Sequence, residues 1–583
     1  MSRTSREGAS LVARAFASVA LAAVTLAGPS ASAQPAAPLS ALAASVATAS
    51  AGSAGAPATV DYDSTREIFH PAHALHGMVA SESRLASEVG VRELQKGGNA
   101  VDAAVAVAYA LAVTLPGAGN IGGGGFMVLY DAKSGRATTI DFREVAPGRA
   151  SRDMYLDAQG DVVPGKSLFT PLAVGVPGTV AGLTYALEHY GSRPRAELVE
   201  PAIALAQDGF IVDEPLAFQL ASARAHLGAW PASRAIFFKD GRPLQAGERL
   251  RNPDLAASLR LIAKDGAPAF YTGPIAARLV ADAQAHGSLL TADDLRAYKP
   301  VERPPVRGHY RGYEIVSMPP PSSGGVHIVQ ILNMLSNYPL AQWGVNSAKT
   351  VHVMSEAMKR AYADRSKYLG DPDFVKVPVA GLTSQAYADE LDRGIDLARA
   401  TPSSEIRPGS PQPYESDQTT QFTVADGQGD VVSVTYTLNW TFGSGIVAAG
   451  TGILLNDEMD DFSAKPGVPN AFGLVGGEAN SVQARKRPLS SMSPTIVLKD
   501  GKPWLATGSP GGSRIITTTL ETIVDMIDFG LNPAEAAALP RFHDQWIPEE
   551  LRVEKGFSPD TLALLAAMGH AVRLGPVMGR TQT

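Results

Sequence analysis

The spacing of apolar residues between positions 82 and 113 predicts two consecutive helices. The stretch ESRLASEVGVRELQKGGNAVDAAVAVAYALAV is divided by Gly97 and Gly98, which favour a helix end. Its second half is apolar on almost every side, so we expect a helix that is buried all round. That half is too short to span a bilayer, and it carries Asp102.

Helical spacing continues through the first two thirds of the chain and then changes to alternation. Residues 176–300 show helical periods with scattered strands, and TVHVMSEAMKRAYADRSKYL, residues 350–369, predicts a strongly amphipathic helix. Residues 399–418 are rich in Pro, Ser and charge, which is typical of an exposed linker. From Thr419 apolar and polar residues alternate in TTQFTVAD and again in VVSVTYTL, and the GQG between them predicts a β-hairpin. The boundary at Gln418/Thr419 is the sharpest change of pattern in the chain.

A third pattern, LATGSPGGSRIITTTLETIVDMI, predicts a strand, a glycine turn and a helix. Gly511 and Gly512 free their N–H groups near the helix start, where donors lack intrahelical partners and the helix dipole is positive. Such a turn can stabilise a developing oxyanion, or it can be an ordinary tight turn. Ser490 and Ser491 in RPLSSMSPTI can likewise bind a carboxylate or cap a turn.

Composition narrows the class of protein. The chain has 583 residues, of which 45% are apolar and 18% are charged, as in a soluble globular protein with a large core. The net charge is −7 and no basic run occurs, so neither nucleic acid nor an anionic membrane is an expected partner. Cysteine is absent from the sequence, which excludes disulfides, thiol catalysis and cysteine-ligated zinc.

The first 60 residues differ from the rest. Three arginines precede or open the apolar run AFASVALAAVTLA, and an Ala-x-Ala site ends at Ala33, which together predict a secretory signal peptide over residues 1–33. A membrane anchor would need a longer uninterrupted apolar span. Residues 34–60, rich in Ala, Ser, Gly and Pro, favour a flexible leader. We therefore expect an exported protein, periplasmic or secreted, without stable membrane insertion.

Two motifs suggest sites that their context argues against. GAGNIGG, from Gly117, satisfies G-x-G-x-x-G, but it follows Pro116 and a helical run instead of leaving a strand and opening a helix. Close backbone packing or a substrate wall is the better interpretation. His70, His73 and His76 are interrupted by proline and have no carboxylate neighbour, so we interpret them as loop histidines. The chain contains neither G-x-S-x-G nor H-E-x-x-H.

Threonine chemistry offers a different kind of site. Thr419 and Thr420 stand at the mouth of the first predicted strand, and Thr435 and Thr437 lie on the next. A threonine hydroxyl is a weak nucleophile unless a base lies beside it. A cut immediately before Thr419 would free an α-amine with a pKa of about 8, so that one residue would supply both nucleophile and base. The residues alone leave open the simpler interpretation that two threonines begin a strand.

Several long motifs resemble those of bacterial gamma-glutamyltranspeptidases, which are N-terminal-nucleophile hydrolases. Towards the C-terminus they are QTTQFTVAD, VTYTLNWTFGSGIV, GILLNDEMDDFSAKPGVPN, KRPLSSMSPTIV and GSPGGSRIITT. Towards the N-terminus they are GGNAVDAAVA, GNIGGGGFM and DFREVAP. They occur in the family's order, and the resemblance runs from about residue 68 to the end.

The resemblance implies an α+β fold, a four-layer αββα sandwich made as one precursor. That precursor would cut itself between Gln418 and Thr419 into a large subunit, residues 61–418, and a small catalytic subunit, residues 419–583, which remain together as a heterodimer. The implied activity is that of a γ-glutamyltransferase and glutathione hydrolase with no cofactor and no metal. A γ-glutamyl-enzyme ester would form from glutathione or another γ-glutamyl compound and pass to water or to an amino-acid or peptide acceptor.

The resemblance also implies roles for individual residues. Thr419 matches the nucleophile, with its free amine as the base, and Thr437 matches a threonine that supports it. Gly511 and Gly512 match the glycines of the oxyanion hole.

The remaining matches concern the glutamyl head of the substrate. Arg143 matches the arginine that pairs with the α-carboxylate, in a fork geometry suited to guanidinium. Ser490 and Ser491 match the serines that assist this arginine in binding the α-carboxylate. The α-ammonium is held by a set that matches Asn439, Glu458 and Asp461. One arginine and two carboxylates complement a zwitterion.

Three positions differ from the family pattern. Gln421 stands where a His commonly follows the two threonines, and we expect little consequence. Glu458 occurs where some bacterial members carry Gln, which adds negative charge near the ammonium. Phe472, in the expected lid PGVPNAFGLVGG, replaces a Tyr found in some members and cannot donate a hydrogen bond to Asn439. We therefore expect looser lid closure, and the balance of transfer and hydrolysis stays open.

Three other hypotheses compete with this one. A cephalosporin or glutaryl-type acylase would share the fold and nucleophile, but Arg143 and Asp461 favour a free amino-acid head. A non-catalytic exported binding protein would keep the fold and never be cleaved. A dinucleotide-dependent enzyme is the most distant of the three.

Overall fold

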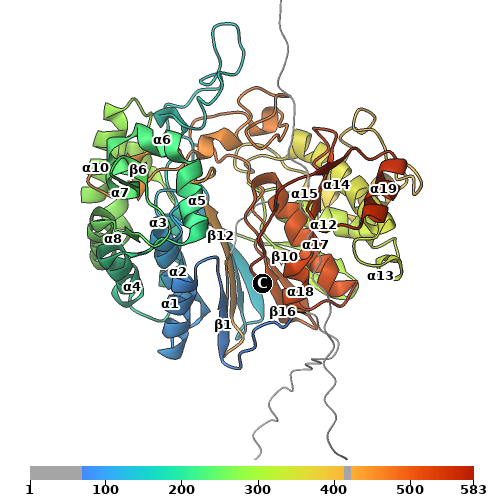
Figure 1. The fold of residues 1–583 in the computed structure, drawn as a ribbon, viewed down its shortest axis with the longest axis horizontal. Helices are drawn as coiled ribbons and strands as arrows, with labels where there is room; N and C mark the ends of the chain where they lie inside the picture. Colours follow the sequence, from blue (N-terminus) through green and yellow to red (C-terminus); the bar gives the residue numbers. More distant parts are fainter. Residues whose placement is uncertain (1–68, 412–421) are drawn as a thin grey trace, which may run out of the picture. The chain divides into compact units, whose positions relative to one another are not determined.

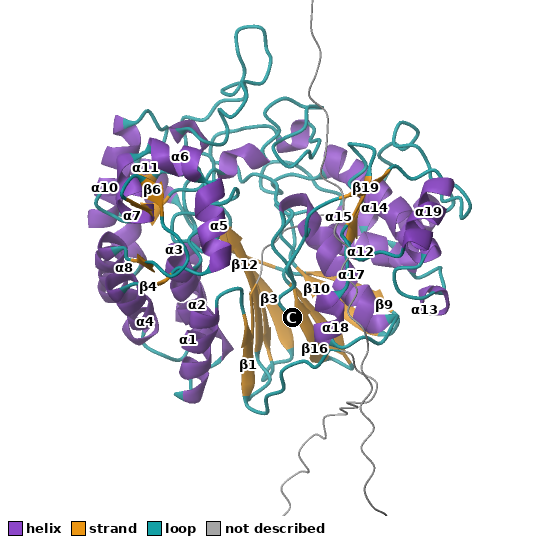
Figure 2. Cartoon of the chain, in the orientation of Figure 1, coloured by secondary structure: helices purple, strands orange, loops and turns teal. Residues whose placement is uncertain are grey.

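The computed structural model describes residues 69–411 and 422–583. The expected signal peptide, the leader and the cleavage point at Gln418 and Thr419 lie outside these residues. Among the described residues, a pair of antiparallel sheets face each other, and helices cover the outer face of each sheet (Figure 1, Figure 2). This is the α+β, four-layer αββα arrangement that the resemblance implies.

The six-stranded sheet combines strands from both sides of the expected cleavage point. Its order is β1 (Gly77–Ala80), β11 (Phe422–Asp426), β12 (Val431–Thr437), β2 (Gly124–Asp131), β3 (Arg136–Phe142) and β8 (Val301–Arg303). The predicted hairpin is confirmed as β11 and β12, with Phe422 opposite Val434. This hairpin lies between β1 and β2, so each of its edges pairs with a strand from before residue 412. The two segments of the chain therefore share one hydrogen-bonded sheet.

The four-stranded sheet consists, in order, of β16 (Lys502–Thr507), β15 (Thr495–Lys499), β10 (Tyr313–Ser317) and β9 (Val306–Tyr310). The core between the two sheets includes Phe126 and Val128 of β2 and Ile496 of β15. The alternate residues of β2, Met127 and Leu129, face the helical layer.

The helices outside the six-stranded sheet confirm the first predicted pattern. They are α1 (Arg84–Gln95), α2 (Ala100–Thr114), α3 (Thr179–Tyr190), α4 (Arg195–Asp208) and α8 (Pro253–Asp265). Every residue of α2 is buried, as expected. Asn99 and Asp102 cap α2 reciprocally, and Asp102 also accepts hydrogen bonds from the backbone N–H groups of residues 192 and 193.

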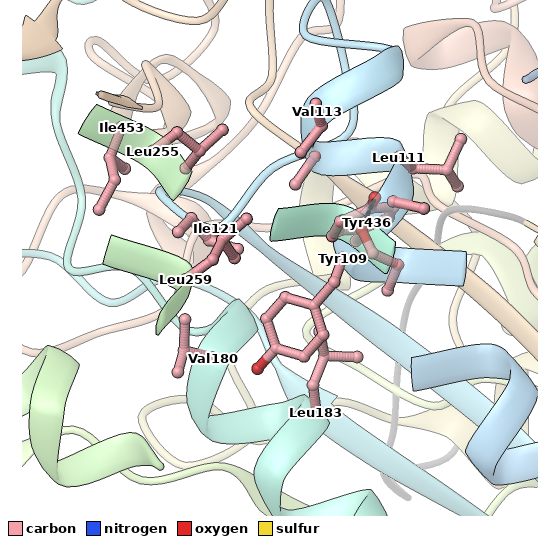
Figure 3. Close-up of a cluster of buried hydrophobic side chains, with 14 of the residues drawn as sticks. Tyr109, Leu111, Val113, Ile121, Val180, Leu183, Leu255, Leu259, Tyr436 and Ile453 are labelled. Carbon is pink, nitrogen blue, oxygen red and sulfur yellow. Dashed lines mark hydrogen bonds between the residues drawn. The ribbon is translucent and has the colours of Figure 1, made fainter. Parts of the chain in front are cut away.

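The core beneath these helices joins the same two segments of the chain. Figure 3 shows Tyr109 and Leu111 of α2 in one cluster with Leu259 of α8 and with Tyr436 and Ile453, which follow residue 421. Tyr436 also donates a hydrogen bond to the carbonyl oxygen of residue 108 at 2.9 Å. Apolar packing and backbone pairing thus connect the two segments.

The outer layer of the four-stranded sheet contains α12 (Gly324–Leu335), α14 (Ala348–Tyr368) and α17 (Ile515–Ile527). The helix predicted over residues 350–369 is confirmed as α14, but its amphipathic pattern does not mark a solvent face. Residues 350–365 are all buried, and Glu356 forms ion pairs with Lys359 and Arg360 inside the protein. Between residues 350 and 365, helix α14 is covered on every side because α12, α16 and the segment around α19 pack against it.

Smaller elements complete the fold of the described residues. The helices among them are α5 (Glu214–Ser222), α6 (Arg224–Ala229), α7 (Pro231–Phe237), α9 (Ala267–Tyr271), α10 (Pro274–Ala285), α11 (Ala292–Ala297), α13 (Leu340–Trp343), α15 (Val379–Leu382), α16 (Gln385–Asp392), α18 (Pro533–Ala538) and α19 (Pro559–Ala567). The strands are β4 (Phe210–Ile211), β5 (Phe238–Lys239), β6 (Arg242–Pro243), β7 (Arg249–Leu250), β13 (Val447–Ala448), β14 (Ile453–Leu454), β17 (Phe542–His543), β18 (Leu551–Val553) and β19 (Val572–Leu574). The 3-10 turns are η1 (Pro171–Ala173), η2 (Glu458–Asp461), η3 (Glu478–Asn480) and η4 (Gly512–Arg514).

The prediction of an exposed linker over residues 399–418 is only partly correct for the residues that the structure describes. Its described residues, 399–411, contain neither helix nor strand, as expected. However, Ser403 and Ile406 are buried, and the backbone N–H of Gly409 donates to Asp364 at 2.8 Å. Hydrogen bonds to the folded body therefore hold this stretch in place. Within residues 69–411 and 422–583, no helix combines the length and apolarity needed to cross a bilayer.

Candidate active site

A cavity of about 760 Å³ gathers most of the residues that the sequence singled out. Its wall is formed by the end of β12, turn η2, the expected lid, and the turn that leads into α17. The expected site residues on this wall are Thr437, Asn439, Glu458, Asp461, Ser490, Ser491, Gly511 and Gly512. Arg143 lies directly behind the wall, with no exposed surface, and Thr419 lies outside the described residues.

The end of β12 is shaped by a left-handed residue. Asn439 has a φ of 79°, which a non-glycine residue adopts rarely and asparagine most readily. This turn lets the Asn439 N–H donate to Thr437 Oγ1 at 2.9 Å, while its side chain donates to the carbonyl oxygen of Asp457 at 3.0 Å. The hydroxyl of Thr437 and the amide of Asn439 are thus held on one edge of the cavity.

The glycine motif that satisfied G-x-G-x-x-G supports this edge from behind. A Cβ added at Gly119, Gly122 or Gly123 would lie 2.0–2.2 Å from a backbone oxygen, which for Gly123 is that of Thr437. Gly117 forms part of the cavity wall. Close backbone packing, one of the two interpretations of this motif, is confirmed for Gly119, Gly122 and Gly123. The three histidines lie in the loop before β1, also as predicted.

Arg143 follows the last residue of β3 and is the centre of a buried charge cluster. Its Nη2 lies 2.5 Å from Asp461, its Nη1 pairs with Glu458, and its Nε donates to the carbonyl oxygen of Pro488 at 3.2 Å. In this structure the guanidinium fork is therefore directed at the two carboxylates. A substrate carboxylate would have to share the arginine with them or displace one of them.

The charges of this cluster are set by burial. Burial raises the pKa of Glu458 to about 7, although the neighbouring Arg143 opposes the shift. Burial, together with the charge of Glu458, raises the pKa of Glu144 well above its usual value. Burial also raises the pKa of Asp461, and Arg143 and Arg365 oppose that shift. Because Glu144 is fully buried and lies 3.8 Å from Arg143, it is the member that most favours the protonated form.

The two serines lie on the irregular segment that precedes β15, and this segment is hydrogen-bonded to the residues that lead into α12. The Ser490 N–H donates to the carbonyl oxygen of Pro321 at 2.7 Å, and Ser323 Oγ donates to the carbonyl oxygen of Ser490 at 2.9 Å. Ser491 Oγ accepts a hydrogen bond from Nη2 of Arg365 at 3.3 Å. Sequence reasoning missed Arg365, because it was one basic residue among several in a predicted helix.

The glycine turn is confirmed as the connection between β16 and α17, with η4 inserted. Gly511 and Gly512 have φ values of 138° and 60°, which L-residues with side chains rarely adopt. Neither N–H has a hydrogen-bond partner among the residues that the structure describes. A Cβ at Gly512 would lie 2.5 Å from the Phe472 ring. The turn therefore presents two unused donors beside the expected lid.

Phe472 belongs to the expected lid and lies on the cavity wall. Its ring packs on Trp440, with ring centroids 5.5 Å apart, and its carbonyl oxygen accepts from Gln545 at 3.3 Å. The backbone N–H of Ala471, the residue before Phe472, donates a hydrogen bond to the Asp460 carboxylate at 3.2 Å. The segment around Phe472 is therefore attached by packing and by backbone hydrogen bonds.

Comparison with known proteins agrees with this geometry. Residues 86–583 match the family model described as Gamma-glutamyltranspeptidase. The chain is 59% identical to a glutathione hydrolase proenzyme of Escherichia coli (strain K12), over 90% of this chain and 90% of that protein.

Two solved structures are also similar. A cephalosporin acylase from Bacillus halodurans aligns with a TM-score of 0.78 and 28% identity, over 90% of this chain and 94% of that one. The gamma-glutamyltranspeptidase of Helicobacter pylori aligns with a TM-score of 0.58 and 45% identity, over 58% of this chain and 97% of that one. With the family model covering most of the chain, this protein belongs to the gamma-glutamyltranspeptidase family.

Proposed function

We propose that this protein is a γ-glutamyltransferase and glutathione hydrolase that matures by cleavage between Gln418 and Thr419. The observation that carries the proposal is one cavity lined by two carboxylates, two serines and an open glycine turn, with a buried arginine paired to both carboxylates behind its wall. Glutathione and other γ-glutamyl compounds are the expected donors, and water, amino acids or peptides are the acceptors. The chemistry expected of this site uses only protein groups.

Recognition of the donor rests on its zwitterionic head. Its α-carboxylate would share Arg143 with the serine hydroxyls, and its α-ammonium would neutralise Glu458 and Asp461. Arg143 and the two carboxylates already pair with one another, so the head exchanges one set of ion pairs for another and leaves no buried charge unpaired. A glutaryl head lacks the ammonium and would leave a carboxylate uncompensated. This difference supports a γ-glutamyl donor over a glutaryl one.

The reaction itself needs three functions. The Thr419 hydroxyl would attack the γ-carbonyl, and its own α-amine would take the hydroxyl proton and return it to the leaving amine. The oxyanion that forms on the carbonyl would accept hydrogen bonds from the N–H groups of Gly511 and Gly512. The resulting ester bond would then be attacked by water or by an acceptor amine, which restores the free hydroxyl.

Thr437 is the residue expected to support the nucleophile, and the register of the hairpin is consistent with that role. In the antiparallel pair, the beginning of β11 at Phe422 lies opposite Val434, three residues before Thr437 on β12. The Thr437 oxygen accepts from the Asn439 N–H, so its own hydrogen stays available to a neighbour on the cavity side.

The two products of cleavage would stay together as a heterodimer. Strands β11 and β12 pair with β1 and β2, and Tyr436 is buried against α2. Separation would expose this core and break both ladders. We further propose that residues 1–33 are removed on export and that 34–60 form a leader, which N-terminal sequencing of the exported protein would test.

Intact mass and activity test the proposal together. The wild type should appear as two polypeptides, the smaller one beginning at Thr419, and should release p-nitroaniline from γ-glutamyl-p-nitroanilide far faster than from glutaryl-p-nitroanilide. Thr419→Ala should remain one chain without activity. Thr419→Ser keeps the hydroxyl and should still be cleaved. An uncleaved wild type would support a binding protein, and preference for the glutaryl substrate would support an acylase.

A further inference from the structure

Arg365 is a buried cation that the proposed mechanism does not use. It lies on α14 near the end of its buried stretch and is only 4% exposed. Its Nε donates to Ser323 Oγ at 2.9 Å and its Nη2 to Ser491 Oγ at 3.3 Å. Within residues 69–411 and 422–583 it has no carboxylate within ion-pair distance. A guanidinium without an ion-pair partner is costly to bury, so its position needs a reason.

The bond to Ser491 determines which way that hydroxyl donates. A guanidinium has five donors and no acceptor, so Ser491 Oγ must be the acceptor in this contact. The hydroxyl hydrogen is then left for another partner, and Ser491 lines the cavity. A hydroxyl that already accepts from a cation is also a stronger donor, because hydrogen bonds in a chain polarise one another.

The charge of Arg365 also acts on this region of the cavity. Asp461 contacts Arg143 directly, and the charge of Arg365 also lowers the pKa of Asp461, against the stronger effect of burial. Burial lowers the pKa of Arg365 itself to about 10, so the side chain remains cationic at neutral pH. The other groups that affect it are Tyr362 and Arg143, and neither neutralises it at that pH. An anion bound beside Ser491 would therefore find a positive charge that forms no direct ion pair with a carboxylate of the described residues.

We propose that Arg365 is a positioning residue for the donor's α-carboxylate. It holds Ser491 with its hydroxyl hydrogen free for the carboxylate and adds the positive charge that Arg143, already shared between Glu458 and Asp461, does not supply. This inference rests on the proposed function and extends it, because it explains how the site binds an anion although the guanidinium fork of Arg143 is occupied.

A purely structural interpretation makes different predictions. If Arg365 only tied α14 to Ser323, the N-cap residue of α12, replacing it would lower stability and affect all ligands alike. If it positions the α-carboxylate, its loss would weaken only ligands that carry that group. L-Glutamate has it, and 4-aminobutyrate is the same molecule without it.

The experiment compares Arg365→Met, Arg365→Lys and the control Ser323→Ala, which removes the other contact of the guanidinium and the hydrogen bond to the Ser490 carbonyl oxygen but keeps the Ser491 hydroxyl. Two-chain maturation and melting temperature are recorded first, followed by kcat and KM with γ-glutamyl-p-nitroanilide and the inhibition constants of both amino acids. We expect Arg365→Met to raise KM and the glutamate inhibition constant at least about tenfold, and to leave kcat within about threefold of the wild type. The tenfold change corresponds to the loss of one hydrogen bond to a charged group, which is worth about 1.5 kcal/mol. The inhibition constant of 4-aminobutyrate should not change. Arg365→Lys should recover some of the loss, and Ser323→Ala should keep the wild-type ratio of the two inhibition constants.

Two results would overturn the inference. One is an unchanged glutamate constant in matured Arg365→Met, and the other is an equal weakening of both inhibitors. If the Met variant does not mature, the effect of Arg365→Lys is measured twice, once in the wild type and once in Ser491→Ala. A residue that acts through Ser491 adds little once that hydroxyl is gone, so the Lys substitution should have a smaller effect in Ser491→Ala. A wild type inactive on the γ-glutamyl substrate would instead refute the proposed function, before any variant is compared.

Discussion

Replacing Glu458 by Gln should remove a specific pH dependence from donor recognition. The carboxyl is buried, pairs with Arg143, and belongs to the group expected to hold the donor ammonium. Gln keeps the size and one hydrogen-bond acceptor but cannot carry charge. The variant therefore represents, at every pH, the protonated form of the wild type.

The expected magnitude follows from the pKa of Glu458, which burial raises to about 7. At pH 6 about one tenth of the carboxyl is ionised and at pH 8 about nine tenths, so the anion that attracts the ammonium forms as the pH rises. The ratio of wild-type to Glu458→Gln kcat/KM should rise up to about tenfold between these values. A unit charge about 4 Å away at an effective dielectric constant of 20 is worth about 4 kcal/mol, which exceeds the 1.4 kcal/mol of a tenfold change, so the titration and not the attraction sets the limit.

The assay is kcat/KM for γ-glutamyl-p-nitroanilide across pH 5.5–8.5 in both proteins. Because kcat/KM reports groups of the free enzyme and free substrate, titration of the Thr419 amine and of the donor amine cancels in the ratio. Glutaryl-p-nitroanilide, which has no ammonium, is the control, and with it the ratio should not rise with pH. A flat or falling ratio with the γ-glutamyl substrate would refute the argument that ionised Glu458 binds the ammonium.

Three further predictions use other regions of the structure. Gly512→Ala should lower kcat about 10²–10³-fold with little change in KM, because the added Cβ would meet the Phe472 ring at 2.5 Å and shift an N–H group of the oxyanion hole. If the turn only binds the substrate, steady-state kinetics would show a change in KM alone. Phe472→Tyr should raise the ratio of transfer to hydrolysis with glycylglycine as acceptor by restoring a hydroxyl that can bond to Asn439; an unchanged product ratio would contradict this. Asp102→Ala should lower the free energy of unfolding, measured in urea, by about 3 kcal/mol, because four hydrogen bonds to a buried carboxylate are lost. The kcat and KM of the folded protein should not change. A loss of stability below about 1 kcal/mol would contradict this prediction.

The local pattern predicted several elements well. The break at Gly97 and Gly98, the hairpin around residues 427–429 and the turn at Gly511 and Gly512 all depend on backbone preferences that neighbouring residues express by themselves. These are interactions within one turn of chain, so the sequence contains them directly.

Solvent exposure was predicted less well. The amphipathic pattern of residues 350–369 indicated a polar face in water, yet α14 is buried on all sides from residue 350 to residue 365. The stretch 399–411 looked like a free linker, yet Asp364 and other groups of the folded body hold it. In both cases a distant segment covers what a short window identifies as surface.

The order of the amino acids specifies the periods of the helices and strands, the glycine turns, and the set of residue types suited to a zwitterion. Which of these residues meet depends on how the folded chain packs. This packing inserts β11 and β12 between β1 and β2, directs Arg143 at carboxylates more than 300 positions away, and brings Arg365 to Ser491 across 126 positions. The physical reason is that local periodicity depends on backbone geometry, whereas these contacts depend on how two sheets and two helical layers bury their faces together.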